Sequence, residues 1–446
     1  MIVMKFGGSS LESAVAIKRV VGIVADRLAQ KPVVVVSAMG KTTNKLLAIA
    51  NEAASGKRQA ALELLSELRA YHVTEGGPVA VVDPLFGELE ELVKGLSVMQ
   101  ELTPRTIDAI SSYGERLSSA ILTLAFESAG IAAVNVDSRS VIVTDNRHTQ
   151  AAPMLQQSYA RLAATIPALA ETHVVVMGGF IGATEAGITS TLGRGGSDFS
   201  ASIAGAGIGA SEIQIWTDVD GMLTADPTIL PGGHRVKIIS FAEAAELAYF
   251  GAKVLHPATV MPAIEKNIPV LILNSRRPEA EGTRIVKDAV PCTNSAKSIA
   301  CKKNITLMNI LSTRMFMAHG FLRRIFEVFD RYETAVDMVA TSEVSVSLTI
   351  DNTSKLAEIR TELEQFSEVT VEENQAIVCL VGDNIRYTPG VASRAFHALE
   401  KINIRMISQG ASLLNLSIVV AQDDLRPAVQ QLHTEFFSEL DPGVFD

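Results

Sequence analysis

Six short apolar runs in the first two thirds of the chain limit the fold more than any other feature. They are rich in Val and Ile, apolar on both faces, and bounded by Gly, Pro or polar residues. The runs are IVMKF, PVVVVSA, AAVNV, HVVVMGGF, EIQIWT and IPVLIL. The segments between them, such as 11–29 and 105–129, have helical spacing. This pattern predicts an α/β fold, a three-layer open and mostly parallel sheet with ligand sites at the carboxyl ends of its strands.

A second region is predicted after residue 285. Residues 286–304 are polar and irregular, so we interpret them as a connecting passage. An internal repeat follows, because 320–350 and 390–418 align with a two-residue deletion. Both read glycine, amphipathic helix, strand, small polar turn and alternating strand. Each repeat is too small to bury its sheet alone, so we expect the repeats to pair with each other or with another subunit.

Composition narrows the class of protein. The 446 residues suggest about three domains, and the net charge is −10. Because no dense Lys/Arg cluster is present, no nucleic-acid partner is expected. No uncharged apolar run reaches the ~18 residues of a membrane helix, and the N-terminus does not resemble a signal peptide. Three cysteines without a C-x-x-C pair indicate neither a disulfide framework nor a zinc knuckle, so the expected compartment is the cytoplasm.

Two glycine motifs in the sequence are misleading. SAMGKTT (37–43) ends like a phosphate-binding Walker loop, but Val35 stands where that motif needs glycine. GAGIGA (205–210) matches a dinucleotide fingerprint, but it closes a predicted helix and precedes a strand. A dinucleotide fingerprint must do the reverse, so we interpret GAGIGA as a helix C-terminus.

Two other glycine loops carry charge. KFGGSS (5–10) places Lys5 at a strand end, before Gly7 and Gly8 and a predicted helix. Backbone N–H groups at such a turn bind phosphate, and the lysine adds a positive charge. GRGGSD (193–198) also precedes a predicted helix, with Asp198 in its first turn. Arg194 suits a carboxylate as a bidentate fork, and an acidic neighbour suits an amine. A plain βα turn or a surface ion pair remains the alternative for each loop.

Three further stretches are weak signals by themselves. WTDVDGMLTADP (216–227) places Thr217 and Asp218 at a strand's carboxyl end, where a nucleotide could lie, although D-G and D-P are also common turn dipeptides. FGAKVLHP (250–257) places Lys253 near a junction between helices. YGERLSS (113–119) places Glu115 within a helix.

Taken together, these motifs resemble the aspartate kinase (aspartokinase) family. The matching stretches are KFGGSS, YGERLSS, GFIGAT, TLGRGGSDFSA, IWTDVDG and FGAKVLHPATVMPA. GFLRRIF and VDMVATSEVSVSL are similar to the effector-binding ACT domains of the lysine-sensitive, monofunctional branch. The resemblance runs over essentially the whole chain, and the set is specific although no single motif is. It implies an amino acid kinase domain at 1–285 and two ferredoxin-like ACT units at 300–380 and 381–446, with interleaving of the two left open.

The resemblance also implies a reaction and a set of site residues. The family phosphorylates the side-chain carboxylate of L-aspartate with ATP and Mg²⁺, the first step of lysine, threonine and methionine biosynthesis. Lys5 would compensate charge on the transferred phosphoryl group, and Asp198 would orient Lys5. Residues implied for aspartate are Thr43, Glu115, Arg194, Gly195, Gly196 and Ser197. Residues implied for the nucleotide are Lys5, Phe6, Gly7, Gly8, Thr217, Asp218 and Lys253. No residue is assigned as a metal ligand.

Regulation is implied by the repeats. Asp337 of the first repeat aligns with Arg405 of the second, and an aspartate suits the amine of an amino-acid effector. By resemblance the effector is L-lysine, giving feedback inhibition. The implied effector residues are Phe321, Leu322, Asp337, Thr341, Ser342 and Glu343. A homodimer through the ACT units is expected, and a tetramer is left open.

Three positions depart from the pattern. Leu223 and Thr228 stand where a nucleotide-site tyrosine and arginine are expected, and Ala318 stands where a serine is expected in the effector region. Nucleotide contacts at Leu223 and Thr228 are therefore left open. Two alternative functions also stay open. One is another amino-acid-kinase superfamily member, such as a glutamate, acetylglutamate or uridylate kinase. The other is a catalytically inactive amino-acid sensor, which the presence of Lys5, Asp198 and Lys253 disfavours.

Overall fold

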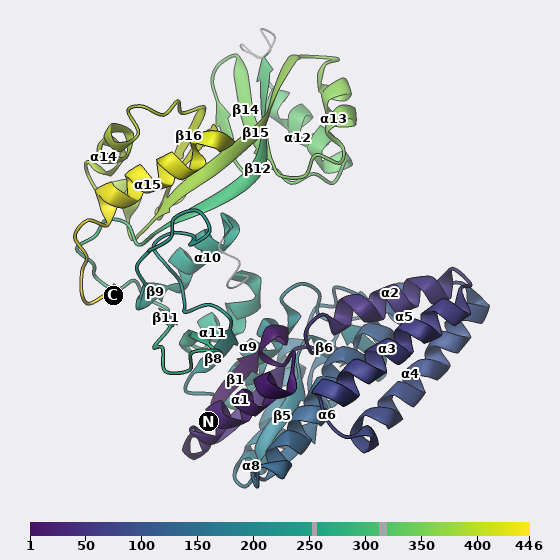
Figure 1. Cartoon of the computed structure of the whole chain (residues 1–446). Coiled ribbons are helices and arrows are strands. Elements are labelled where there is room, and N and C mark those ends of the chain that lie inside the picture. Colours follow the sequence, from purple (N-terminus) through teal and green to yellow (C-terminus); the bar gives the residue numbers. More distant parts are fainter. Residues whose placement is uncertain (252–256, 312–318) are drawn as a thin grey trace. The chain divides into compact units, whose positions relative to one another are not determined.

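The structure is a computed structural model that describes residues 1–251, 257–311 and 319–446 (Figure 1). Contacts divide it into two compact units. The first comprises Met1–Met222 and Val254–Asp288, and the second comprises Leu223–Lys253 and Ala289–Asp446. The boundary predicted at residue 285 places 223–253 with the first segment, whereas the contacts group these residues with the second unit.

The first unit is built on a mostly parallel sheet. Its strands run in the order β3-β5-β2-β1-β8-β10-β11, and only β11 is antiparallel to its neighbour. Their bounds are β3 (Ala133–Val136), β5 (Val174–Gly178), β2 (Pro32–Val36), β1 (Ile2–Phe6), β8 (Ile213–Thr217), β10 (Val270–Asn274) and β11 (Thr283–Val286). All six predicted strands are therefore confirmed, and they are the six parallel ones.

Helices cover both faces of this sheet, as a parallel sheet requires. Met4, Val34 and Val176 lie in one row across three neighbouring strands. They belong to a core that α1 (Ala14–Ala25) and α6 (Tyr113–Ser128) also fill. Two further helices, α8 (Leu155–Ala170) and α9 (Gly196–Ile208), pack against each other and against strands of the same sheet. The remaining helices of the unit are α2 (Thr42–Ala54), α3 (Arg58–Glu75), α4 (Val79–Met99), α5 (Pro104–Ser111), α7 (Ser138–Val141) and α11 (Met261–Glu265).

Two helix predictions need adjustment and one is confirmed. The helix expected at 11–29 is the shorter α1, because Ser13 caps it and accepts a hydrogen bond from the Ala16 N–H. The helix expected at 105–129 divides at Ser112 into α5 and α6. GAGIGA does end a helix, since α9 closes at Ile208 and Gly209 adopts a left-handed φ of 61°. A residue without a Cβ adopts that conformation at little cost.

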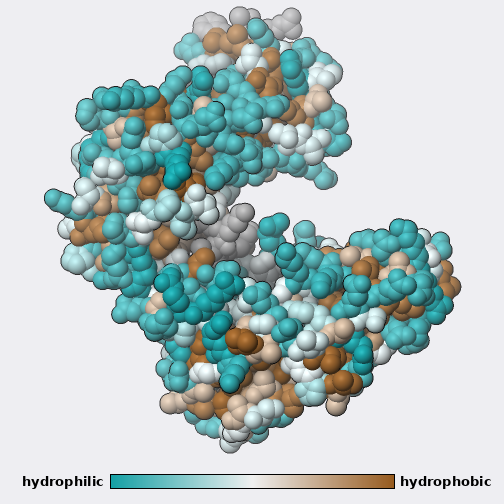
Figure 2. Space-filling view, in the orientation of Figure 1, coloured by the Kyte–Doolittle hydropathy of each residue, from teal (hydrophilic) through white to brown (hydrophobic). Residues whose placement is uncertain are grey.

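A small sheet of β4 (Val143–Thr144), β6 (Ile181–Thr184) and β7 (Thr189–Thr191) leads into the GRGGSD loop. Across the described part of the chain, no helix combines the length and the apolar character that a membrane span needs. The face drawn in Figure 2 is largely hydrophilic, with small scattered apolar patches.

The second unit is an antiparallel sheet in the order β13-β14-β12-β15-β17-β16. Its centre is a pair of 14-residue strands, β12 (Ser298–Leu311) and β15 (Glu368–Val381). Around this pair lie β13 (Val339–Thr341), β14 (Ser345–Ile350), β16 (Met406–Gln409) and β17 (Asn415–Ala421). Its helices are α10 (Phe241–Tyr249), α12 (Phe321–Arg331), α13 (Leu356–Leu363), α14 (Val391–Ala398) and α15 (Leu425–Phe436), and β9 (Ile238–Ser240) precedes α10.

The internal repeat appears as two equivalent arrangements of a helix followed by two strands. Residues 320–350 form α12, β13 and β14, and residues 390–418 form α14, β16 and the start of β17. Each helix begins after a glycine in the left-handed region, Gly320 with φ 81° and Gly390 with φ 85°. One end of β12 pairs with β14 and the other end lies opposite the part of β15 that pairs with β17. The two repeats therefore share both central strands, as Figure 1 shows.

The interpretation of 286–304 as an irregular passage is wrong for its last seven residues. They belong to β12, where Ile299 and Ala300 are buried. A register shift between Lys302 and Ile305 interrupts the alternation of side chains, so the run does not read as a strand. Just before it, the fully buried Lys297 pairs with the fully buried Glu243 of α10 at 3.1 Å.

Candidate active site

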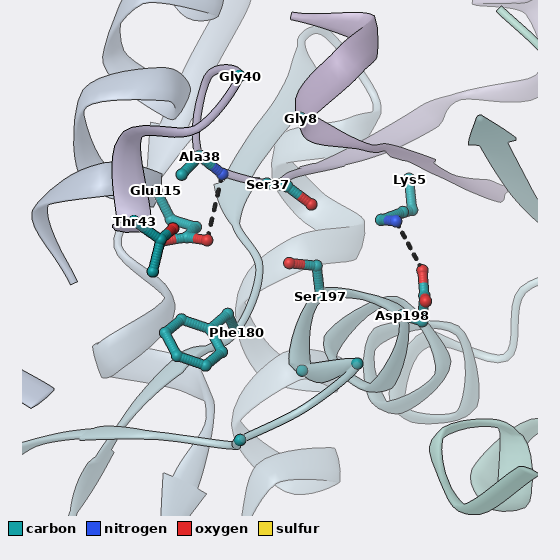
Figure 3. A pocket seen from close by; sticks show the side chains of 13 residues that line it. Lys5, Gly8, Ser37, Ala38, Gly40, Thr43, Glu115, Phe180, Ser197 and Asp198 are labelled. Carbon is teal, nitrogen blue, oxygen red and sulfur yellow. Dashed lines mark hydrogen bonds and ion pairs between the residues drawn. The ribbon is translucent and has the colours of Figure 1, made fainter. Parts of the chain in front are cut away.

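A cavity of about 340 Å³ opens at the carboxyl ends of β1 and β2 (Figure 3). Four loops and the first turns of three helices meet there. Its lining residues are Lys5, Gly8, Ser37, Ala38, Gly40, Thr43, Glu115, Phe180, Gly193, Gly195, Gly196, Ser197 and Asp198. The structure thus brings together eight of the residues predicted for catalysis or for ligands, from stretches as far apart in sequence as 5 and 198.

Lys5 and Asp198 form an ion pair on one side of the cavity. Lys5 ends β1, is only 9% exposed, and its Nζ lies 2.7 Å from Asp198 Oδ1. Asp198 lies in the first turn of α9, as predicted, where the helix dipole favours a carboxylate. The pair places one positive and one negative charge side by side in a poorly solvated wall. Phe6 differs, because its side chain is fully buried and stacks on Trp216 with ring centroids 5.8 Å apart. Only its backbone can face a ligand.

The KFGGSS loop contacts the loop that follows β2, which was not predicted to belong to the site. After β1 the chain makes a single 3-10 turn, Gly8–Ser10, and α1 starts only at Ala14. The Gly40 N–H donates to the Gly8 carbonyl at 3.0 Å, which joins the two loops. A Cβ on Gly8 would lie 2.7 Å from the Ala38 oxygen and 2.9 Å from the Gly40 oxygen. Glycine is therefore required here by close backbone approach.

We expect Gly8→Ala to distort this wall of the cavity. The new methyl group would overlap two rigid carbonyl oxygens, so the loops would separate at a cost of about 1–3 kcal/mol. The expected result is a fall of at least about tenfold in kcat/KM for the nucleotide, measured by steady-state kinetics. Gly22→Ala is the matched control, because a Cβ on Gly22 of α1 meets nothing within 4 Å. Equal activity of the two variants would contradict the prediction.

Glu115 lies deepest in the site. It is in the first turn of α6, 3% exposed, and its Oε1 accepts a hydrogen bond from the Ala38 N–H at 3.1 Å. Its Oε2 is buried, with no hydrogen-bond partner in the described part of the chain. Burial raises the pKa of Glu115 to about 8, and the Ala38 N–H only partly opposes this shift. The carboxyl group is therefore suited to bind a cationic group that enters the cavity.

The GRGGSD loop presents backbone and small side chains to the cavity. Gly193 and Gly195 have φ values of 74° and 72°, which favour glycine, and α9 starts at Gly196. Gly195, Gly196 and Ser197 line the cavity as predicted. Arg194 is exposed and is not among the lining residues.

A buried carboxylate that the sequence analysis missed anchors the approach to this loop. Asp108 of α5 is fully buried and accepts hydrogen bonds from Thr191 Oγ1 at 2.5 Å, His148 Nδ1 at 2.7 Å and the Thr149 N–H at 3.0 Å. Thr191 ends β7, two residues before Gly193. A single aspartate on a helix gives no sequence signal for this role.

The loop that follows β2 also contributes more residues to the cavity than predicted. Ser37, Ala38 and Gly40 line the cavity, whereas only Thr43 of this stretch was predicted. Their signal was SAMGKTT, which we set aside because it fails as a Walker loop. A glycine turn between a buried strand and a helix was nevertheless sufficient reason to expect a ligand site. Phe180 and Gly193 also line the cavity and were not predicted.

The predicted nucleotide residues outside the cavity lie on the neighbouring strand end. Thr217 ends β8 and its Oγ1 donates to Asp218 Oδ1 at 3.3 Å, while Asp218 is exposed. Because the Gly7 N–H donates to the Trp216 carbonyl at 3.2 Å, this strand end adjoins the KFGGSS loop. Lys253 lies outside the described residues. Leu223 is half-buried, and Thr228 is exposed and bonded to Asp226.

The predicted effector residues fall into four environments in the second unit. Phe321 is 7% exposed and packs into the core of the first repeat, with Phe366 edge-on, so its side chain is structural. Leu322 is exposed. Thr341 is the exposed last residue of β13, and Ser342 and Glu343 lie in the exposed turn that follows, where the Ser342 and Ser345 hydroxyls are 2.7 Å apart. Asp337 precedes β13, and its side chain is only 5% exposed. Ala318 is outside the described residues.

Comparison with known proteins agrees with this architecture. Residues 1–274 match the amino acid kinase family, and residues 378–436 match an ACT domain. Aspartokinase 1, chloroplastic, of Arabidopsis thaliana is 40% identical, with 98% of this chain and 80% of that protein covered. Lysine-sensitive aspartokinase 3 of Escherichia coli is 36% identical, with 98% and 99% covered.

Solved structures give the same result. E. coli aspartokinase III in complex with aspartate and ADP (R-state) superposes with a TM-score of 0.82 at 34% identity, covering 98% of this chain and 100% of that one. The same enzyme with lysine and aspartate (T-state) gives a TM-score of 0.86 at 34% identity, covering 98% and 99%. The chain therefore belongs to the aspartokinase family and is an aspartate kinase, with an amino acid kinase fold followed by ACT domains.

Proposed function

We propose that the chain transfers the terminal phosphoryl group of ATP to the side-chain carboxylate of L-aspartate, giving 4-phospho-L-aspartate. The Lys5–Asp198 pair beside two glycine loops is the observation that carries this proposal. The relative solved with aspartate and ADP supports the choice of substrates. Feedback inhibition by L-lysine is proposed as well, because a relative of similar length is lysine-sensitive.

The chemistry explains the charged loops. A carboxylate is already a nucleophile at neutral pH, so no general base is needed, and Asp198 need not remove a proton. The remaining obstacle is electrostatic repulsion, because the aspartate carboxylate must approach the negatively charged phosphates of ATP. Positioning of the two substrates and compensating positive charge lower this barrier. Lys5 supplies the compensating charge. Asp198 keeps the Lys5 ammonium at the cavity wall when no phosphate is bound.

The amino-acid end of the substrate is assigned to the other side of the cavity. Glu115 pairs with the α-ammonium group through its free Oε2. Thr43 and Ser197 donate hydrogen bonds to the α-carboxylate. Arg194 is exposed, so its guanidinium group has to turn toward the cavity to bind the same carboxylate as a fork.

Mg²⁺ is proposed to arrive with the nucleotide. Outside residues 252–256 and 312–318, no group of three or more His, Cys, Asp or Glu side chains could hold a metal ion. A site with so few protein ligands fits Mg²⁺, which is commonly held by substrate phosphates with one or two carboxylates and water. Because Glu115 is assigned to the substrate's ammonium, Asp198 is the cavity carboxylate left to take part. The bound ion would neutralise phosphate charge.

The test is trapping of the acyl phosphate with hydroxylamine, with ATP and each candidate acceptor. We expect aspartyl hydroxamate with L-aspartate and no hydroxamate with glutamate or N-acetylglutamate. Phosphorylated uridylate is not trapped by hydroxylamine, so that acceptor is tested by coupled detection of ADP, and no ADP release is expected. Product from one of those acceptors instead would favour another superfamily activity. Binding of lysine without any phosphoryl transfer would favour the inactive sensor.

The homodimer through the ACT units and the cytoplasmic location remain proposals. Ultracentrifugation tests the first, and cell fractionation tests the second.

Asp337→Asn is expected to abolish lysine inhibition. The substitution keeps the shape of the side chain but removes the charge that would pair with an effector ammonium. We expect the half-inhibitory lysine concentration to rise at least about tenfold, in the range of typical coupling energies. Asp330→Asn on the exposed face of α12 is the control and should leave inhibition unchanged. Unchanged lysine sensitivity of Asp337→Asn would contradict the placement of the effector.

A further inference from the structure

Lys302 of β12 lies at the centre of a charged cluster that the sequence motifs did not indicate. Its Nζ is 2.6 Å from Asp337 Oδ1 and 2.7 Å from Asp351 Oδ2. The side chains of Lys302 and Asp337 are 21% and 5% exposed, and that of Asp351 is 43% exposed. Asp337 is therefore not a free surface carboxylate. It is held in place by a lysine of the same chain.

The cluster carries one uncompensated negative charge. Two carboxylates and one ammonium group give it a formal net charge of −1. Asp337 Oδ2 is buried and has no hydrogen-bond partner among the described residues. Burial raises the pKa of Asp337, and the neighbouring Lys302 opposes that shift. Without Lys302, this carboxyl group would be easier to protonate and less able to bind a cation.

Lys302 also connects Asp337 to α10. Its Nζ lies 5.8 Å from the centroid of the Tyr249 ring, at the end of that helix. One turn earlier, Glu246 accepts hydrogen bonds from Ser412 Oγ at 2.6 Å and Asn415 Nδ2 at 2.7 Å. The helix α10 therefore contacts both repeats, and Lys302 is its link to the first.

We propose that Lys302 is the positioning residue of the effector site and its link to the helix α10. It keeps Asp337 ionised and holds the free Oδ2 toward the effector ammonium. When an effector binds that oxygen, Lys302 changes its contact with Tyr249. This inference rests on the proposed binding of lysine at Asp337. It adds to that proposal a residue outside the predicted effector set, and a contact through which a bound effector would act.

The first test measures lysine binding by calorimetry on the full-length protein. Lys302→Met is expected to weaken binding about tenfold, because Asp337 loses its partner. Lys302→Arg retains the charge and should stay within about threefold of the unmodified chain. Lys303→Met is the matched control, since Lys303 is the exposed neighbour on the same strand. Unchanged binding in Lys302→Met, or equal losses in the Met and Arg variants, would overturn the inference.

The second test separates binding from transmission. Tyr249→Leu removes the ring beside Lys302 but leaves Asp337 and its partner, so lysine binding should stay within about twofold. We expect its activity at saturating lysine to be at least about threefold higher than that of the unmodified chain. Full inhibition of Tyr249→Leu would exclude the proposed link. If the unmodified chain itself binds no lysine, the effector proposal fails first, and this outcome is distinct from either result for Lys302.

Discussion

Replacing Lys5 with alanine is expected to lower kcat about a thousandfold, the effect of removing one preorganised donor from a developing negative charge. The Lys5 ammonium is the buried positive charge at the cavity wall, and Asp198 fixes its position at 2.7 Å. The compensation matters most while the phosphoryl group is in transfer, so KM for aspartate should change far less than kcat. Steady-state rates of hydroxamate formation measure both constants.

Two companion variants make the Lys5 result interpretable. Lys18→Ala removes an exposed lysine of α1 and should keep full activity. Lys5→Arg keeps the charge, but its larger planar group cannot occupy the same position, so only part of the rate should return. Thermal unfolding of each variant checks that the fold is intact. A folded Lys5→Ala variant with kcat within a few-fold of the unmodified chain would exclude the proposed mechanism.

The sheet could be predicted from the sequence because its strands are buried on both faces. IVMKF and PVVVV contain no polar residue on either face except Lys5, which lines the cavity. A run of this kind has few alternatives to a central parallel strand. The strand β12 was missed for the opposite reason. Its first half is polar and carries a register shift, so only its pairing with β15 identifies it.

The site was predictable where local sequence determines it and not where distant residues meet. Gly195 and Asp198 follow from a loop that must turn and then start a helix. Asp108 supports that loop from 83 residues away, and nothing in its local sequence indicates this. The same applies to Lys302, whose partner Asp337 is 35 residues distant. Burial and partners arise from tertiary packing, so the sequence indicated residue types but not the partners of Asp108 and Lys302.

Aspartate binding is expected to depend on pH through Glu115. The pKa of this carboxyl group is raised to about 8, so below that pH the group in the unliganded cavity is mainly neutral. Binding of an ammonium group requires the ionised form, and each pH unit below about 8 then costs about tenfold in affinity. The aspartate KM should therefore fall about a hundredfold between about pH 6 and about pH 9, and level off above the pKa. The substrate's side-chain carboxylate keeps its charge over this range.

Glu115→Gln is the variant that isolates this effect. Glutamine has the same shape, and its Oε1 can still accept the Ala38 N–H, but it cannot ionise. At about pH 6 the variant and the unmodified chain should differ least in aspartate binding, because the side chain at position 115 is then mainly uncharged in both. At about pH 9 it should bind about a hundredfold more weakly, so the difference between the two grows with pH. A pH-independent aspartate KM in the unmodified chain, or a slope that survives in Glu115→Gln, would show that another group receives the substrate's ammonium.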